Sequence, residues 1–186
     1  MLKLYGGSRS RASIVQWYLE ELSVPYEFIL LDMKQKEHLE PDFLQINPFG
    51  KVPAIVDGEF QLWESGAILL YLAEKYEQPN WSVEQRSLVN QWILFANSTL
   101  SIGLFVEASR EQETPKLLNP LNQILQERDY ILGQDFTVAD VAVGSILAYI
   151  PMMLPTDLTP YNEVLKYIKK ISDRPAWQKT YKQRAE

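Results

Sequence analysis

The sequence contains no cysteine and only a single histidine in 186 residues. Without cysteine the chain can form no disulfide, offers no thiolate nucleophile of its own and has no cysteine ligands for zinc. One histidine cannot supply a cluster of imidazole ligands. We therefore expect neither a metal centre nor catalysis by a cysteine of the protein.

Positive charge and long apolar runs are also scarce. The chain has 18 Lys and Arg against 24 Asp and Glu, a net charge of −6, whereas a nucleic-acid binder needs clustered basic residues. No unbroken apolar run approaches the ~18 residues that a membrane span needs. The first residues, MLKLYGG, are typical of a strand and lack the apolar segment of a signal peptide. We expect a cytoplasmic protein that binds neither nucleic acid nor membrane.

Strand and helix patterns alternate through residues 1–76. Apolar alternation predicts strands at 2–5 and 26–31, and helical spacing predicts a helix at 14–22 between them. Residues 32–46 are polar and predict an irregular segment with a short helix. Strands at 52–56 and 60–63 are joined by Asp57-Gly58, a strong hairpin signal, and a helix follows at 68–76. The order β-α-β-α-β-β-α indicates an α/β domain.

From residue 83 onward the pattern is helical. Apolar spacing predicts helices around 89–95, 117–125, 138–149 and 164–171, with the third ending before Pro151. Thr137 and Asp140 are spaced as a capping box at the start of the third helix. We predict an α/β domain at 1–76, a linker at 77–83 and an all-helical domain at 84–186.

Two features between residues 50 and 76 suggest a binding surface. Pro53 has no N–H to donate, so it weakens a strand if it lies in the strand interior. A cis peptide bond before Pro53 would turn the N–H and C=O of Val52 outward, where they could pair with the backbone of a short extended peptide. Ser65 stands at a helix start, where free amides favour a carboxylate, and Glu64 can bind an ammonium group. A carboxylate and an ammonium group on one carbon form the α-amino-acid end of a ligand, so Glu64 and Ser65 together could bind such an end. A proline-terminated strand and a serine-capped helix explain the same residues without any ligand.

The same stretch closely resembles the glutathione transferase family. The resemblance rests on Asn47-Pro48-Phe49-Gly50-Lys51-Val52-Pro53, on Leu62-Trp63-Glu64-Ser65-Gly66-Ala67-Ile68 and on Arg174-Pro175-Ala176-Trp177, and extends over almost the whole chain. It implies a thioredoxin-like N-terminal domain, an all-α C-terminal domain that contributes a hydrophobic substrate site, and a homodimer. It also implies conjugation of reduced glutathione to small hydrophobic electrophiles in detoxification or stress response, with a peroxidase side activity. The alternative is a non-catalytic binding or interaction module of the same fold.

The resemblance also implies roles for individual residues. Val52 would pair with the cysteinyl backbone of glutathione, beside a cis Pro53, while Glu64 and Ser65 would hold the γ-glutamyl end. His38 and Lys51 would bind the glycine carboxylate, although both could equally be surface residues.

The residue that activates the thiol is expected in the first strand-to-helix loop. Counting forward from Leu4-Tyr5 selects Ser10, which could instead cap the first helix, and counting back from Leu19-Glu20-Glu21 selects Arg9. Ser8 is a third candidate. The short chain and the Ser/Arg-rich loop suggest a bacterial member. Candidate walls of the second substrate site are Gly103, Leu104, Phe105 and residues 149–153.

Overall fold

The computed structural model describes residues 1–77 and 80–182, and the chain forms two compact units. The first unit comprises Met1–Asn80 together with Pro175–Glu186, and the second comprises Trp81–Arg174. Part of the linker predicted at 77–83, Gln78 and Pro79, lies outside the described residues. The first unit also takes in the last helix, which the sequence placed with residues 84–186.

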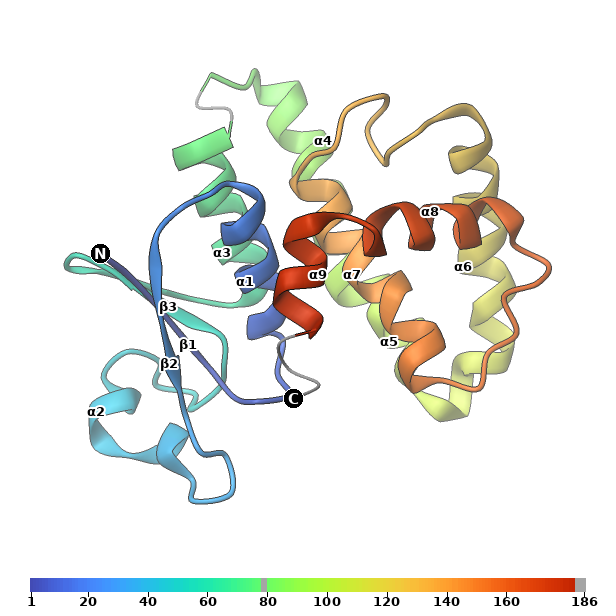
Figure 1. The fold of residues 1–186 in the computed structure, drawn as a ribbon. Helices are drawn as coiled ribbons and strands as arrows, with labels where there is room; N and C mark the ends of the chain where they lie inside the picture. Colours follow the sequence, from blue (N-terminus) through green and yellow to red (C-terminus); the bar gives the residue numbers. More distant parts are fainter. Residues whose placement is uncertain (78–79, 183–186) are drawn as a thin grey trace. The chain divides into compact units, whose positions relative to one another are not determined.

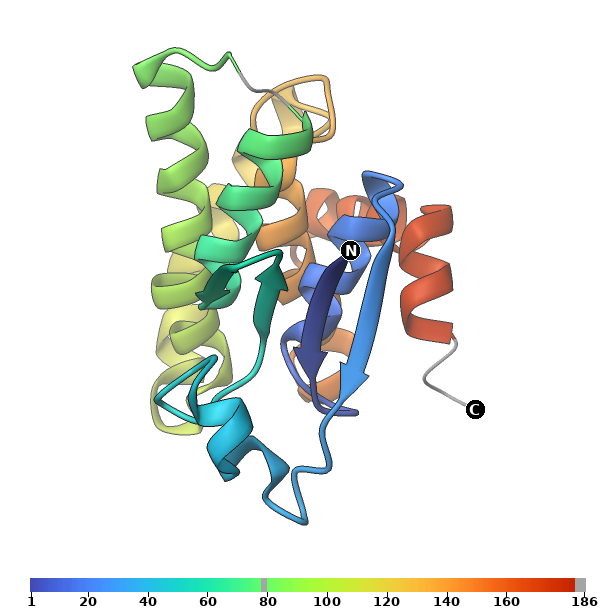
Figure 2. The same ribbon diagram turned by 90° about the vertical axis from the view of Figure 1, so that its left-hand side faces the viewer.

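A four-stranded sheet forms the centre of the first unit. Its order is β2 (Tyr26–Leu30), β1 (Leu2–Gly6), β3 (Ala54–Asp57) and β4 (Phe60–Trp63). Strands β1 and β2 are parallel, and the other pairs are antiparallel. In Figure 2 the arrows of β1 and β2 run toward the segment that carries α2 (Pro41–Leu44). This is the predicted thioredoxin-like α/β arrangement.

Helices α1 (Ala12–Glu21) and α3 (Ser65–Leu72) pack against each other and against the sheet. Most of α1 is buried, including Trp17 and Tyr18, which explains its apolar sequence. Gly6 allows β1 to end close to α1, since a Cβ there would lie 2.4 Å from the Cβ of Ala12. Helix α3 continues into a π-helical turn, η2 (Ala73–Glu77), and a 3-10 turn, η1 (Glu37–Leu39), precedes α2.

The C-terminal helix α9 (Pro175–Lys182) packs against α1, as Figure 1 shows. The rings of Trp17 and Trp177 meet edge to face with centroids 4.8 Å apart, and Trp177 is only 5% exposed. Lys179 forms an ion pair with Glu20 at 2.5 Å. A helix nearly 160 positions away in sequence thus completes the core of the first unit.

The second unit is all helical. It contains α4 (Val83–Leu94), the π-helical η3 (Phe95–Leu100), α5 (Ser101–Phe105), α6 (Glu107–Glu127), α7 (Val138–Met153) and α8 (Asn162–Ser172). Helix α7 is its core element, because nearly all of its side chains are buried.

The predicted capping box at the start of α7 is confirmed. The Thr137 hydroxyl and the Asp140 carboxylate each accept a backbone N–H at this end of the helix. Asp140 is fully buried and also accepts from the N–H of Ile131 and the hydroxyl of Tyr167, both at 2.8 Å. Burial raises the pKa of the Asp140 carboxyl.

Two element boundaries that were predicted from prolines were wrong. Strand β3 begins at Ala54, so Val52 and Pro53 precede the strand instead of lying inside it, because proline has no N–H for the ladder. Helix α7 continues through Pro151 to Met153. Pro151 sits in the last turn, where few further hydrogen bonds depend on it, and the N–H of Leu154 still donates to the C=O of Ile150 at 2.9 Å.

Among the described residues, one helical stretch, Val83–Phe105, is long and apolar enough on average to cross a membrane. The sequence search for unbroken apolar runs did not detect it. About 44% of an apolar 18-residue window within this stretch is buried inside the protein, and core helices of soluble proteins have the same length and composition. This stretch is therefore weak evidence for a membrane span.

Candidate functional site

Sheet register brings four of the predicted site segments to one end of the sheet. Tyr5 pairs with Ala54, and Ala54 pairs with Trp63, so the residues after β1, before β3 and after β4 are neighbours. Gly6 pairs with Leu30, so the segment after β2 starts at the same end. The loop at 7–11, the turn at 47–53, the Glu64-Ser65 junction and His38 therefore belong to one surface of the first unit.

The loop at 7–11 connects β1 to α1 and is organised by Ser10. The Ser10 hydroxyl donates to the C=O of Gly7 at 3.1 Å and accepts the N–H of Gly7 at 3.1 Å and of Ala12 at 3.3 Å. The bonds of the Ser10 hydroxyl therefore favour the second role that the sequence allowed, capping of the first helix, over direct contact with a ligand. Ser8 and Arg9 lie between these anchor points and are exposed.

Asn47 organises the turn before β3, a role that the sequence analysis missed. Its side chain is 2% exposed; its carbonyl oxygen accepts the N–H of Phe49 at 3.1 Å, and its amide donates to the C=O of Lys51 at 2.7 Å. Gly50 adopts a φ of +59°, which favours glycine. Asn47 stood in the quoted motif, but only its position beneath the turn identifies it as the residue that fixes Lys51 and Val52.

Val52 presents its backbone at this turn. The Val52–Pro53 peptide bond is cis, as the resemblance implies. Within the described parts of the chain, neither the N–H nor the C=O of Val52 has a recorded hydrogen-bond partner, because the ladder of β3 starts only at Ala54. Val52 is half-buried and Pro53 is buried. The geometry can therefore accommodate an extended peptide beside Val52.

The Glu64-Ser65 junction combines a strained residue with a free helix end. Glu64 has φ +72° and ψ +119°, a conformation that side-chain-bearing residues rarely adopt. Its C=O accepts the N–H of Ile68 at 2.9 Å, so α3 begins directly after it. Ser65, 3% exposed, and the residues after it offer the first amides of the helix, which have no intrahelical acceptor. The exposed carboxylate of Glu64 lies beside these donors.

His38 and Lys51 extend the site toward α2. A Cβ on Gly50 would lie 3.0 Å from the C=O of His38, so the η1 turn contacts the turn that carries Lys51. The Nδ1 atom of His38 is buried and has no hydrogen-bond partner among the described residues, while Lys51 is exposed. His38 is therefore a partly buried residue of the site surface, not a fully solvated one.

The predicted walls of a second substrate site divide into core and surface residues. Leu104 is fully buried, and Gly103 lets α5 approach α6, because a Cβ there would lie 2.5 Å from Leu117. These two residues serve the core of the second unit. Met152 and Met153, at the end of α7, are 63% and 65% exposed. They remain available to an apolar ligand.

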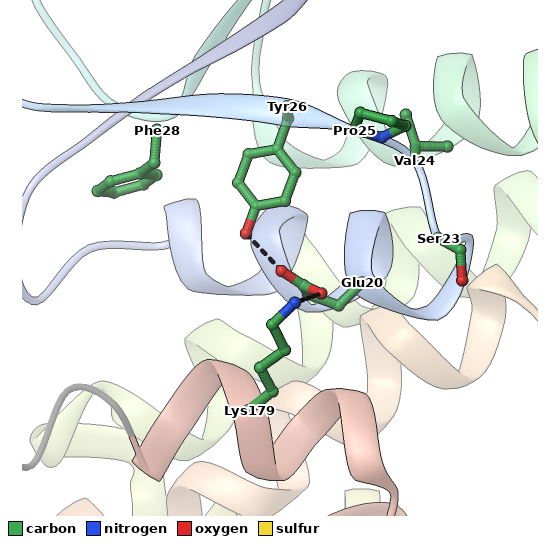
Figure 3. Close-up of a pocket in the computed structure, with 7 residues that line it drawn as sticks. All are labelled: Glu20, Ser23, Val24, Pro25, Tyr26, Phe28 and Lys179. Carbon is green, nitrogen blue, oxygen red and sulfur yellow. Dashed lines mark hydrogen bonds and ion pairs between the residues drawn. The ribbon is translucent and has the colours of Figure 1, made fainter.

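A separate pocket of about 540 Å³ lies in the first unit, and Figure 3 shows its lining. It borders the start of β2, where Tyr26 pairs with Leu2, and extends along that strand to Phe28. Glu20 accepts from the hydroxyl of Tyr26 at 2.8 Å and pairs with Lys179, so the polar groups satisfy one another. None of the predicted glutathione residues lines this pocket. In the described part of the chain there is also no group of His, Asp and Glu side chains suited to a metal ion.

Comparison with protein families matches both units. The family model "Glutathione S-transferase, N-terminal domain" matches residues 1–74, and "Glutathione S-transferase, C-terminal domain" matches residues 104–184. Glutathione S-transferase F9 of Arabidopsis thaliana is 30% identical over 97% of this chain and 96% of its own length. Glutathione S-transferase D7 of Drosophila melanogaster is 27% identical over 95% of this chain and 87% of its own.

Solved structures agree with the sequence comparison. Glutathione transferase F2 of Populus trichocarpa superimposes with a TM-score of 0.85 at 29% identity, covering 100% of this chain and 99% of its own. Glutathione transferase URE2P6 of Phanerochaete chrysosporium, solved in complex with oxidised glutathione, gives 0.87 at 26% identity, covering 99% and 96%. With both family models matched and a 30% identical relative covered almost end to end, the chain belongs to the glutathione S-transferase family.

Proposed function

We propose that this protein conjugates the thiolate of reduced glutathione to small hydrophobic electrophiles. The observation that carries the proposal is the convergence of the unpaired Val52 backbone, the free N-terminus of α3 and the Glu64 carboxylate at one end of the sheet. A γ-linked tripeptide matches these groups: an extended backbone in the middle, with an amino group and a carboxylate at one end. The relative from Phanerochaete chrysosporium, solved with oxidised glutathione, supports this ligand.

Each part of glutathione is assigned a partner. Val52 pairs with the cysteinyl backbone, as in strand addition. Ser65 and the first amides of α3 bind the γ-glutamyl carboxylate, because a helix N-terminus carries partial positive charge, and Glu64 binds the adjacent ammonium. Lys51 and His38 bind the glycine carboxylate.

Ser8 is the best candidate for the group that stabilises the thiolate. Ser10, the alternative from the sequence, already donates its only hydroxyl hydrogen to Gly7. The Ser8 hydroxyl is exposed and has no recorded hydrogen bond to any described residue. Arg9, exposed beside it, adds a positive charge that favours the thiolate.

The energetic demand on this loop is modest. A free thiol with a pKa of about 8.5 is about 3% ionised at pH 7. Lowering that pKa to about 6.5 gives about 75% thiolate and requires about 2.7 kcal/mol, which one charge-assisted hydrogen bond and a nearby helix N-terminus can supply. Because nucleophilicity falls about 8-fold over the same range, the net gain is only about 3-fold. Most of the acceleration must come from holding thiolate and electrophile together.

The second unit supplies the apolar surface for the electrophile in this proposal, with Met152 and Met153 as exposed candidates. Halogenated compounds, isothiocyanates and organic peroxides all suit such a surface, and the last class would give a peroxidase side activity. We further propose a cytoplasmic bacterial enzyme of detoxification or stress response, with the residues at 1–76 binding glutathione.

A homodimer belongs to the same proposal. Phe49 is 64% exposed although its ring packs on Trp63 with centroids 5.0 Å apart, and Phe60 is 46% exposed. Phe60 is the first residue of β4, an edge strand of the sheet, and Phe49 packs on the last residue of that strand. Exposed aromatic residues gathered at an edge support burial against a second copy, which analytical ultracentrifugation can measure directly.

The test combines calorimetry with turnover. We expect reduced glutathione to bind the wild-type protein and a panel of halogenated, isothiocyanate and peroxide substrates to reveal at least one turnover activity. Ser8→Ala should lower kcat/KM, whereas Ser87→Ala, an exposed serine of α4, should match the wild type. Binding without turnover of any substrate would favour a non-catalytic binding module, whereas absence of binding would refute the enzyme and favour an interaction module.

A further inference from the structure

The loop that carries Ser8 has an anchor that the proposed chemistry does not use. Ser10 bonds to both backbone groups of Gly7 through one hydroxyl, and the same oxygen accepts the N–H of Ala12. One side chain therefore ties the end of β1 to the first amide of α1. Arg11, which immediately precedes α1, makes no capping bond with its side chain, so Ser10 serves that amide instead.

The surroundings of Gly7 leave the loop little freedom. A Cβ on Gly7 would lie 2.7 Å from Cγ of Met33, so the Met33 side chain covers the glycine at close range. The backbone C=O of Ser10 accepts from the hydroxyl of Ser13 at 2.9 Å, which fixes Ser10 to the first turn of α1. Only Ser8 and Arg9, between these anchors, are free to face a ligand.

We propose that Ser10 is a positioning residue: its hydroxyl closes the 7–11 loop and thereby presents Ser8 to the glutathione thiol. This inference rests on the proposed function. Ser10 itself does not touch the thiol, because its one hydroxyl hydrogen is held by Gly7. Its effect on the thiolate is transmitted through the position of Ser8.

The first measurement requires no ligand. Hydrogen exchange of the amides of Gly7 and Ala12 should accelerate roughly 5- to 10-fold in Ser10→Ala, because each loses an acceptor worth about one ordinary hydrogen bond. Ser10→Thr, which retains the hydroxyl, should restore protection, and Ser10→Val, which has the shape of Thr without the hydroxyl, should not. Ser87→Ala is the control: it removes the hydroxyl of an exposed serine in α4, which has no contact with the 7–11 loop.

The second measurement is the pH profile of kcat/KM with a chlorinated dinitrobenzene. Ser10→Ala should raise the apparent pKa of the thiol by about one, as expected for a misplaced charge-assisted hydrogen bond. Ser10→Thr should restore the wild-type profile, and Ser87→Ala should leave it unchanged. In a Ser8→Ala background, Ser10→Ala should add nothing, because a residue that acts through Ser8 has no target there.

Several outcomes overturn the inference. Unprotected Gly7 and Ala12 amides in the wild type would show that the anchor does not hold in solution, even if the variants fail to fold. A full additional pKa increase from Ser10→Ala in the Ser8→Ala background would make Ser10 a direct partner of the thiol. An unchanged profile in Ser10→Ala would refute this inference alone, whereas a wild-type protein that does not bind glutathione would refute the proposed function together with it.

Discussion

The positive φ of Glu64 leads to a prediction that separates stability from binding. Holding a side-chain-bearing residue at φ +72° and ψ +119° costs about 1–3 kcal/mol. Glycine avoids this strain but loses about 0.4–1 kcal/mol through its greater freedom in the unfolded chain. Glu64→Gly should therefore be about 0.5–2 kcal/mol more stable than Glu64→Ala, which retains a Cβ in the same backbone conformation.

Binding should respond differently to the same two substitutions. Both remove the carboxylate that we assign to the ammonium group of glutathione, and losing a hydrogen bond to a charged group costs about 1.5–3 kcal/mol. Affinity for glutathione should therefore fall roughly 10- to 150-fold in both variants. Glu59→Ala, which changes an exposed glutamate at the far end of β4, should leave affinity unchanged.

Urea unfolding and isothermal calorimetry test the two parts separately. A difference of 1 kcal/mol should also appear as about 2–4 °C in the melting temperature of a chain of this size. If Glu64→Gly is no more stable than Glu64→Ala, the strain argument is wrong. If both variants bind glutathione like the wild type, the carboxylate has no part in the site. Confirmation of both parts would mean that the fold retains strain at Glu64 because the ligand requires the carboxylate there.

Two further predictions concern the two cores. Trp177→Ala should cost about 3–5 kcal/mol in urea unfolding, because Trp177 is 5% exposed and packs on Trp17; a loss below 1 kcal/mol would contradict that packing. Burial raises the folded-state pKa of Asp140, so its contribution to stability is greatest below the unfolded pKa of about 4 and is lost as pH rises through the folded value. Asp140→Asn should remove that pH dependence and leave the half-buried N–H of Thr137 without its acceptor, a loss of about 1–3 kcal/mol; an unchanged pH slope would argue against the raised pKa.

Local patterns were sufficient for much of the fold. The hairpin at Asp57-Gly58 and the capping box at Thr137 and Asp140 depend on residues only a few positions apart, so the sequence already specifies them. Pro53 was correctly identified as a disturbance to a strand, but the position of β3 after it required the ladder itself. Pro151 misled the helix prediction because a proline in a last turn removes little hydrogen bonding.

The candidate site residues also divide into those that the sequence could identify and those that required the folded structure. Val52, Glu64 and Ser65 could be nominated from the sequence, since a proline, an acid and a helix start have local chemical meaning, and their roles remain predictions. The sequence left Ser8 and Ser10 as alternatives. Only the folded loop shows that the Ser10 hydroxyl is occupied by Gly7 while Ser8 stays exposed.

By itself, then, the sequence determined the order of strands and helices in residues 1–76, the α/β-then-helical architecture and the positions of the ligand-like motifs, because each follows from periodicity or from short-range chemistry. The tertiary structure alone decided the strained backbone of Glu64, the orientation of Asn47 and the place of α9 beside α1. The contact of α9 with α1 joins residues that are distant in sequence and meet only after the chain has folded, whereas the bonds of Asn47 are local but require the backbone of the folded turn. Such contacts are set by packing between elements, which no local pattern records.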